Sequence, residues 1–278
     1  MEGRQDLSTA LIAGQGILPV EIARRLRELQ PETLILALRD DPEELAPYAT
    51  RLVKMRSPNL GRGLREIKAF GSDRLIMAGR IPKRIIYCLP LLFDRLTRSV
   101  LRKSLRDDHS LLGAIVSVFE AKGITVIPYW QILPEFIASR GKLSSRSPNE
   151  QEQQDVAYGR EILRVTLPCS FGQAVCVAGG AVVAVEAMEG TDKMIHRAGE
   201  LAGRGVVVKM MRTDQDMRYD LPTVGTRTIE AMREAGLSCL AVEAGKTLIL
   251  EPEKFFALAD KYKIAVWGID NEVQSNSK

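Results

Sequence analysis

The sequence predicts an α/β protein of two domains: a Rossmann-like N-terminal domain and a mixed-sheet α/β C-terminal domain. Three observations lead to this prediction. In the first half, strand-length apolar runs alternate with helix-length amphipathic segments. A polar segment at residues 141–154 then interrupts the pattern. In the second half, two apolar runs joined at Gly179-Gly180 give a hairpin signal before further strands and helices follow.

The N-terminal domain is predicted to cover residues 1–140. Gly71 and Gly123 stand where two of its helical patterns end, which is the usual position for a helix-stopping glycine. Because strands separated by helices of this length form parallel sheets covered on both faces, we expect a Rossmann-like arrangement. Strands are predicted at residues 7–13, 33–38, 74–78 and 124–128, and helices at residues 19–29, 60–70 and 110–122.

Residues 141–154 have the composition of a linker, since they are polar, lack apolar periodicity and contain Pro148. A long surface loop within one domain is the alternative. The C-terminal domain is then predicted to cover residues 155–278, with Thr191 as the N-cap of a helix. Its strands are predicted at residues 173–177, 181–187, 205–209, 238–242, 247–250 and 264–267, and its helices at residues 191–201, 226–234 and 253–261.

Composition is that of a soluble globular protein, with 45% hydrophobic and 27% charged residues. The formal net charge is +4, and the basic residues are spread along the chain, so we expect an anionic ligand and no nucleic acid. The four cysteines show no CxxC spacing, which favours the reducing cytoplasm. Since no apolar run approaches about 20 residues and no leader is evident, we expect neither a membrane span nor a signal peptide.

Two short segments of the first half could bind phosphate. Gly14-Gln15-Gly16 lies where the first strand passes into the first helix, where glycines allow close approach of a ligand to a helix N-terminus. Pro19 replaces the third glycine of the dinucleotide fingerprint, so a tight turn without a ligand is the alternative. Gly79-Arg80 follows another strand of the same sheet, and its arginine could bind phosphate with two hydrogen bonds or stay exposed without a role.

The strongest chemical candidate is residues 209–222. Three aspartates and three basic residues lie close together there and interrupt the alternation of strands and helices. Carboxylate oxygens are the ligands that Mg²⁺ prefers, and the cations would offset phosphate charge. A solvated charged loop is the alternative. The charged residues are Lys209, Arg212, Asp214, Asp216, Arg218 and Asp220.

Other candidates have plainer interpretations. Residues 186–192 form a second acidic group at a predicted helix start, where Thr191 and Asp192 are also ordinary capping residues. Lys246-Thr247 follows a glycine as in a P-loop, but the upstream glycine is missing and no helix follows, so we reject a P-loop. His109 and His196 have no paired serine or cysteine in the sequence pattern, which argues against a catalytic triad.

Taken together, these segments resemble the LpxI-type UDP-2,3-diacylglucosamine pyrophosphatases of lipid A biosynthesis. The likeness covers nearly the whole chain and is more specific in the second half, although residues 165–170 depart from the family's usual pattern. The matching segments are residues 14–19 (GQGILP), 77–80 (MAGR), 171–173 (FGQ), 184–192 (AVEAMEGTD), 215–225 (QDMRYDLPTVG) and 240–247 (LAVEAGKT).

The resemblance implies Mg²⁺-dependent hydrolysis of UDP-2,3-diacylglucosamine to UMP and 2,3-diacylglucosamine 1-phosphate. It places the essential aspartate within residues 215–222, where Asp220 is favoured and Asp216 is the alternate, with Arg218 beside them. We take Asp220, Asp216 and Asp192 as the candidate metal ligands. The candidate substrate-binding residues are Gly14, Gln15, Gly16, Gly79, Arg80, Gly190, Thr191, Lys209, Lys246 and Thr247.

A lipid-modified UDP-sugar is therefore the expected partner, with cytoplasmic location and transient contact at the inner face of the membrane. Oligomeric state has no signal in the sequence. Two alternative functions stay open: an NAD-dependent Rossmann oxidoreductase, which the incomplete fingerprint argues against, and a non-catalytic nucleotide-sugar binder, which would bind without turnover.

Overall fold

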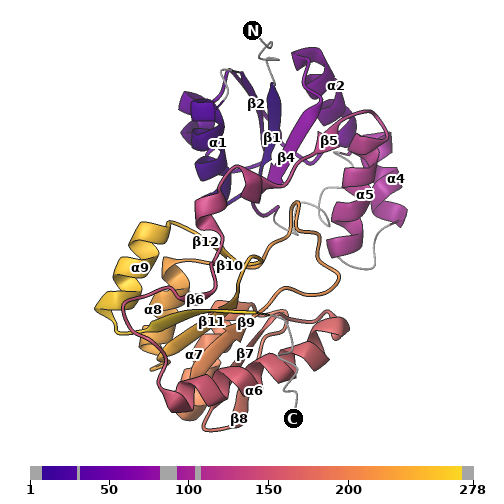
Figure 1. Cartoon of the computed structure of the whole chain (residues 1–278). Helices are drawn as coiled ribbons and strands as arrows, with labels where there is room; N and C mark the ends of the chain where they lie inside the picture. Colours follow the sequence, from indigo (N-terminus) through magenta and orange to yellow (C-terminus); the bar gives the residue numbers. More distant parts are fainter. Residues whose placement is uncertain (1–7, 30–31, 82–92, 104–107, 271–278) are drawn as a thin grey trace, which may run out of the picture. The chain divides into compact units, whose positions relative to one another are not determined.

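The computed structural model describes residues 8–29, 32–81, 93–103 and 108–270 (Figure 1). The chain divides into two compact units, Met1–Leu133 and Pro134–Lys278. The first contains a parallel sheet and the second a mixed sheet, so the predicted fold class is confirmed. Leu7, where the first predicted strand begins, and Cys88 lie outside the described residues. Among the described helices, none has the length and apolar character needed to span a bilayer.

The sheet of the first unit has five parallel strands in the order β3-β2-β1-β4-β5 (Figure 1). All five residues of β2 are buried, which explains its uninterrupted apolar sequence. The chain runs outward from β1 to β3 and then returns to place β4 on the other side of β1. Their bounds are β1 Thr9–Ala13, β2 Thr33–Ala37, β3 Arg51–Lys54, β4 Arg74–Ala78 and β5 Thr125–Val126.

The helices of the first unit begin and end where local chemistry dictates. Helix α2 starts after Asn59, whose side chain accepts a hydrogen bond from the Arg62 N–H, and it ends at Gly71 with φ 80°. Strand β3 and helix α4 were not predicted, because each is short and rich in basic residues that obscure the apolar pattern. The helices are α1 Leu18–Leu29, α2 Leu60–Phe70, α4 Arg95–Lys103 and α5 Asp108–Glu120, with 3₁₀ turns η1 Pro42–Tyr48 and η3 Tyr129–Gln131.

The main sheet of the second unit has the order β6-β13-β11-β9-β7-β8. Strands β9, β11 and β13 are parallel, whereas β7 pairs antiparallel with both β8 and β9. The predicted hairpin is thereby confirmed. Their bounds are β6 Gly141–Lys142, β7 Ala174–Ala178, β8 Ala181–Val185, β9 Val206–Lys209, β11 Cys239–Glu243 and β13 Ala265–Ile269.

A separate two-stranded parallel sheet joins β10 Thr223–Val224 to β12 Leu248–Ile249. The predicted strand at residues 247–250 therefore exists but lies outside the main sheet. The remaining elements of the unit are α6 Glu150–Thr166, α7 Thr191–Ala202, α8 Thr226–Glu234 and α9 Pro252–Lys261, with 3₁₀ turns η4 Pro134–Phe136 and η5 Leu167–Cys169.

Helices cover both faces of the main sheet, as alternate strand residues show. Val207 and Leu240 join the core under α7, α8 and α9, whereas Val208 and Ala241 join the core under α6 (Figure 1). Helix α6 packs closely on the sheet, since a Cβ on Gly159 would lie 2.7 Å from Val208 Cγ2. The sheet is therefore buried on both sides and leaves its strand ends free for chemistry.

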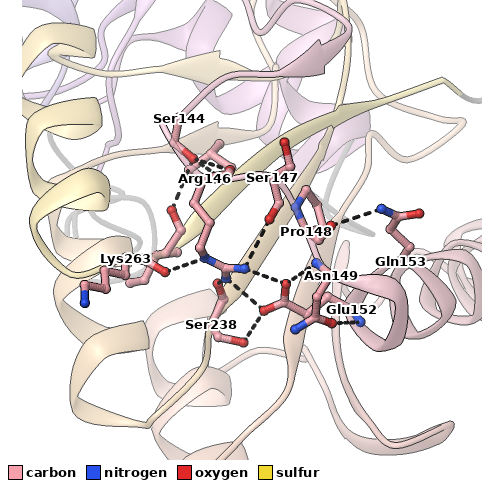
Figure 2. A network of polar contacts seen from close by, with 11 residues as sticks. Ser144, Arg146, Ser147, Pro148, Asn149, Glu152, Gln153, Ser238 and Lys263 are labelled. Atoms are coloured by element: carbon pink, nitrogen blue, oxygen red, sulfur yellow. Dashed lines mark hydrogen bonds and ion pairs between the residues drawn. The ribbon is translucent and has the colours of Figure 1, made fainter.

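The linker predicted at residues 141–154 has a different structure and position. The two units divide between Leu133 and Pro134, and residues 141–154 contribute β6 and the N-terminus of α6 to the second unit. Its polar side chains cap that helix: Asn149 Oδ1 accepts from the Glu152 N–H at 2.9 Å, and Glu152 Oε2 accepts from the Asn149 N–H at 2.8 Å (Figure 2). The polar composition therefore satisfies a helix N-terminus and does not mark a linker.

Candidate functional site

Four chain segments meet at one edge of the main sheet of the second unit. Lys209 at the end of β9 is in register with Val242 of β11 and with Ala174 at the start of β7. Glu186 follows β8 and donates its N–H to the Ala174 carbonyl at 2.9 Å. Glu243 is the last residue of β11. Because parallel strands expose their carboxyl ends at a common edge, charged residues distant in sequence come together here.

A chain of hydrogen bonds links three of these segments. Lys209 Nζ donates to Thr191 Oγ1 at 2.8 Å, and the Thr191 hydroxyl donates to Glu186 Oε1 at 2.7 Å. Glu186 Oε2 accepts from the Gln173 N–H at 3.2 Å. Lys209 and Glu186 are 4% and 7% exposed, so both charges are almost fully removed from water. Each therefore depends on its protein partners for stabilisation.

Burial lowers the pKa of Lys209, while the negative charges of Glu186 and Asp192 act in the opposite direction. The structure thus brings Lys209, predicted to bind substrate, close to Thr191 and Asp192. Its ammonium donates to Thr191, and its main effect within this structure is to orient that hydroxyl.

Thr191 was predicted as the N-cap of α7, and this was wrong by one residue. The N-cap is Gly190, with φ 85°, and Thr191 is the first helical residue. A glycine is favoured there because residues with a side chain rarely adopt positive φ. No side chain caps the first N–H groups of α7. A helix start of this kind favours an anionic ligand.

Two of the three aspartates in the acidic loop, residues 210–222 between β9 and β10, are bound by neighbouring side chains. Arg218 Nη2 and Nε lie 2.7 Å and 3.0 Å from Asp216 Oδ2, and Asp216 Oδ1 accepts from the Arg218 N–H at 2.9 Å. Asp214 accepts from Ser170 Oγ at 2.9 Å and from Arg212 Nε at 3.0 Å. Both carboxylates therefore hold the loop's shape.

These contacts change the titration of the loop. Burial opposes ionisation of Asp216, but the hydrogen bonds from Arg218 outweigh it, so the pKa of Asp216 lies below its usual value. Burial, followed by the negative charge of Asp216, raises the pKa of Tyr219 to about 12. The loop therefore contains an ionised Asp216 and a protonated Tyr219 at neutral pH.

Asp220 differs from its neighbours. Its N–H donates to the Asp216 carbonyl at 2.9 Å, and its side chain is half-buried. No described residue forms a hydrogen bond or ion pair with its carboxylate, so both oxygens are available to a ligand. Asp220, favoured over Asp216 from the sequence, is the loop aspartate with free coordinating atoms.

The donor chemistry of Asp220 fits a hard divalent cation. Within the described residues, no three His, Cys, Asp or Glu side chains are grouped as ligands of a metal. Mg²⁺ does not require such a group, because it is commonly held by one or two carboxylates together with waters and substrate phosphates. Asp216 is less available because Arg218 occupies its oxygens, and Asp192 interacts electrostatically with Lys209.

Glu243 connects the acidic loop to the next turn. It is 1% exposed, its Oε2 accepts from the Met211 N–H at 2.8 Å, and its Oε1 lies 2.9 Å from Lys246 Nζ. The predicted substrate-binding Lys246 is therefore held by Glu243. Thr247 is fully buried, and its hydroxyl has no hydrogen-bond partner in the described part of the chain. Sequence analysis placed Glu186 in the second acidic group but gave neither Glu186 nor Glu243 a role, although both directly end apolar strand runs.

The predicted phosphate-binding segments of the first unit also come together. The Gln15 N–H donates to the Arg80 carbonyl at 2.8 Å, and the Arg80 N–H donates to the Gln15 carbonyl at 3.0 Å. A Cβ on Gly14 would lie 2.8 Å from the Arg80 carbonyl oxygen, so close backbone approach explains this glycine. These loops follow β1 and β4, between which the strand order reverses. That position is where open α/β sheets bind ligands.

Gly16 and Arg39 complete this second site. Gly16 has φ 104°, and a Cβ there would meet nothing within 4 Å, so the space beside it is open. Arg39 follows β2 and is 8% exposed, and its Nη1 donates to the Gly16 carbonyl at 3.2 Å. Arg39 therefore fixes the glycine turn. The sequence pattern did not reveal it, since a single arginine after a strand is not a motif.

Comparisons with known proteins place both halves of the chain in one family. A family model described as the LpxI N-terminal domain matches residues 8–136, and one described as the LpxI C-terminal domain matches residues 139–267. The chain is 30% identical over 275 residues to a protein of Caulobacter vibrioides named UDP-2,3-diacylglucosamine pyrophosphatase LpxI. The alignment covers 94% of this chain and 96% of that protein. This chain belongs to the LpxI family.

Proposed function

We propose that this chain is a Mg²⁺-dependent enzyme of lipid A biosynthesis that hydrolyses the pyrophosphate of UDP-2,3-diacylglucosamine. The products are UMP and 2,3-diacylglucosamine 1-phosphate. The observation that carries the proposal is the free carboxylate of Asp220, within a loop whose other aspartates are bound to arginine or serine. Family membership over both units supports the substrate, since the named relative is called a pyrophosphatase of this compound.

In this proposal Asp220 is the first ligand of Mg²⁺, with Asp216 and Asp192 as further candidates. When bound, the cation would polarise a phosphoryl oxygen and position water. Arg218 and the first N–H groups of α7, beginning with that of Thr191, would offset negative charge on the phosphates. Water attacks the sugar-side phosphorus, and the bridging oxygen leaves with UMP.

Lys209 acts through its neighbours. Its buried ammonium holds the Thr191 hydroxyl, which in turn holds Glu186, so the start of α7 stays fixed against β9. Lys246 and Thr247 are proposed to bind substrate from the turn after β11, and Gly14, Gln15, Gly16, Gly79 and Arg80 from the first unit. These assignments follow the segments that match the family and the strand-end positions.

Two exposed apolar side chains support an acylated substrate. Phe171 is 46% exposed and Met188 is 95% exposed. The backbones of Gly172 and Glu186 lie against each other, since a Cβ on Gly172 would lie 2.0 Å from the Glu186 carbonyl oxygen. Phe171 directly precedes Gly172, and Met188 lies two residues after Glu186. An exposed apolar side chain near each end of this contact would suit an apolar ligand group. We propose that the protein works in the cytoplasm and touches the inner membrane face transiently to take up substrate.

Arg39 argues against the oxidoreductase alternative. In NAD-binding Rossmann folds, an acidic residue about 20 positions after the glycine turn binds the ribose hydroxyls. Here the residue that follows β2 and reaches the glycine turn is an arginine. An arginine does not replace the carboxylate that binds the ribose of NAD, and this one is itself paired with Glu44 at 2.5 Å.

The test is incubation of the full-length protein with UDP-2,3-diacylglucosamine in detergent micelles, with UMP release as the readout. We expect release with Mg²⁺ and a loss of release when EDTA is added. No UMP under either condition would overturn the proposed reaction. Binding of the substrate without turnover in the presence of Mg²⁺ would instead indicate a nucleotide-sugar binder. Release that persists in EDTA would remove the metal from the mechanism.

A further inference from the structure

Helix α4 exposes a row of arginines on one side. Arg95, Arg98 and Arg102 are spaced three and four residues apart, which places them on the same face of a helix. All three are exposed, and together with the exposed Ser99 they line an open depression of about 480 Å³. The basic residues look scattered in the sequence, but this helix gathers three of them.

The opposite side of α4 is attached to the first unit. Asp94 Oδ1 accepts from the Thr97 N–H at 2.8 Å, and Asp94 Oδ2 accepts from the Gly61 N–H of α2 at 2.7 Å. The buried Thr97 hydroxyl accepts from the Leu60 N–H at 2.9 Å. Val100, which is 8% exposed, packs on the same side. These contacts orient the helix so that its arginine face points outward.

No side chain in the described part of the chain compensates the charge of this face. The sequence of α4, RLTRSVLRK, contains no acidic residue, and within the described residues no carboxylate pairs with Arg95, Arg98 or Arg102. Two other exposed arginines of the same unit do have carboxylate partners. Arg24 lies 2.6 Å from Glu21, and Arg51 lies 2.6 Å from Glu66. The α4 face is thus a concentrated positive surface on a chain of net charge only +4.

We propose that the arginine face of α4 docks the protein on anionic phospholipid at the membrane surface. Charge complementarity supports the assignment, because basic side chains near a membrane surface are attracted to the negative charge of anionic lipids. The choice of a membrane over a free phosphate rests on the proposed function, since a substrate with two acyl chains resides in the bilayer. Docking through a basic surface would raise the local concentration of that substrate without a membrane span.

The test is sedimentation of the full-length protein with vesicles of phosphatidylglycerol mixed with phosphatidylcholine, beside vesicles of pure phosphatidylcholine. We expect binding to the anionic vesicles only, weakened by salt. Substitution of Arg95, Arg98 and Arg102 by glutamine should weaken binding by about fivefold for each arginine and about a hundredfold for all three. Exposed arginine-to-glutamine changes leave the core intact, which circular dichroism would verify.

A control of equal charge change replaces Arg56, Arg204 and Arg227, which are exposed and lie apart in sequence, by glutamine. Its binding should fall far less than that of the α4 variant. Equal losses in the two variants would show a general charge effect and overturn the assignment of α4. So would wild-type protein that does not bind anionic vesicles. Lysine at positions 95, 98 and 102 should preserve binding, and a loss there would point to a discrete phosphate pocket and overturn membrane docking.

Activity distinguishes this inference from the proposed reaction. In detergent micelles the α4 glutamine variant should release UMP at the wild-type rate, whereas its rate on substrate embedded in anionic vesicles should fall. Absence of UMP release in micelles by the wild type would defeat the proposed reaction and leave the vesicle-binding result to be judged separately. Duplex DNA that binds as tightly as vesicles, with loss in the α4 variant, would replace the membrane by nucleic acid as the partner.

Discussion

The guanidinium of Arg146 and the carboxylate of Glu152 form a two-pronged ion pair, with Nη1–Oε2 and Nη2–Oε1 both at 2.8 Å (Figure 2). Glu152 Oε1 also accepts from Ser238 Oγ at 2.6 Å, and Arg146 Nε donates to the Lys263 carbonyl at 2.7 Å. Ser238 and Lys263 lie just before β11 and β13. The pair therefore fixes the start of α6 at the amino ends of these strands, opposite the edge that carries the candidate site.

Replacing Arg146 by methionine should destabilise the second unit by about 3 kcal/mol, because Glu152 would remain buried with its charge uncompensated. Urea denaturation followed by Trp267 fluorescence in a Trp130→Phe background measures this. Arg140→Met, which breaks an exposed pair with Asp270 in the same unit, is the control and should cost about 0.5 kcal/mol. Equal effects in the two variants would show that the Arg146 pair adds little.

The same pair predicts a pH dependence. Burial by itself opposes ionisation of Glu152, but hydrogen bonds from Arg146, Ser238 and the Asn149 N–H lower its pKa below the usual 4.5. A carboxyl with a lowered folded-state pKa adds stability above its unfolded pKa and loses it as the pH falls through the folded value. The stability advantage of wild type over Glu152→Gln should therefore shrink below pH 4.5. Urea midpoints measured at several pH values test this, and a constant difference would contradict it.

The glycines of the first unit should respond differently to alanine. Gly79→Ala places a Cβ 2.6 Å from Pro19 Cγ at φ 85°, whereas Gly16→Ala at φ 104° meets open space. Both variants should lose about 1 kcal/mol to backbone strain, and Gly79→Ala should lose about 1–3 kcal/mol more from overpacking. Urea denaturation followed by Trp130 fluorescence in a Trp267→Phe background compares them. A Gly16→Ala variant less stable than Gly79→Ala would refute the contact geometry.

Asp220→Asn should lower the rate of UMP release by about a hundredfold or more with little change in thermal stability, because its carboxylate supports no described contact. Asp216→Asn should instead weaken the loop, since Arg218 loses a charged partner. Initial rates and thermal melts on both variants separate the two roles. Wild-type rates for Asp220→Asn would move the catalytic centre away from this residue.

Thr191→Val removes the hydroxyl that lies between Lys209 and Glu186, whereas Thr191→Ser keeps it. We expect the valine variant to lose about 1–3 kcal/mol of stability, because it leaves two buried charged groups without their shared partner. Its kcat should fall by about tenfold if the start of α7 must stay fixed, a shift of about 1.4 kcal/mol in the barrier. Serine should restore kcat, and an unrestored kcat would show that the hydroxyl is not what matters.

Much of the fold followed from local sequence. Apolar runs predicted most strands, glycines such as Gly71 marked helix ends, and Gly179-Gly180 marked the hairpin. The prediction failed where polar residues stabilise a helix end. Asn149 and Glu152 form a capping box, but their polar sequence was interpreted as a linker. The prediction also missed helix α6, which starts in that capping box, and the short strand β3 and helix α4, whose basic residues weakened the apolar signal.

The sequence by itself determined most of the strands and helices, the α/β class and the segments that resemble one enzyme family, because periodicity and short motifs are local properties. Only the tertiary structure decided that Glu186 and Lys209 share Thr191, and that Asp216 pairs with Arg218 while Asp220 keeps free oxygens. These outcomes depend on strand order and on how the loop between β9 and β10 folds back. Local periodicity contains neither the strand order nor the conformation of this loop. Strand order brings together residues that are far apart in the chain, and a loop has no periodic pattern to predict it.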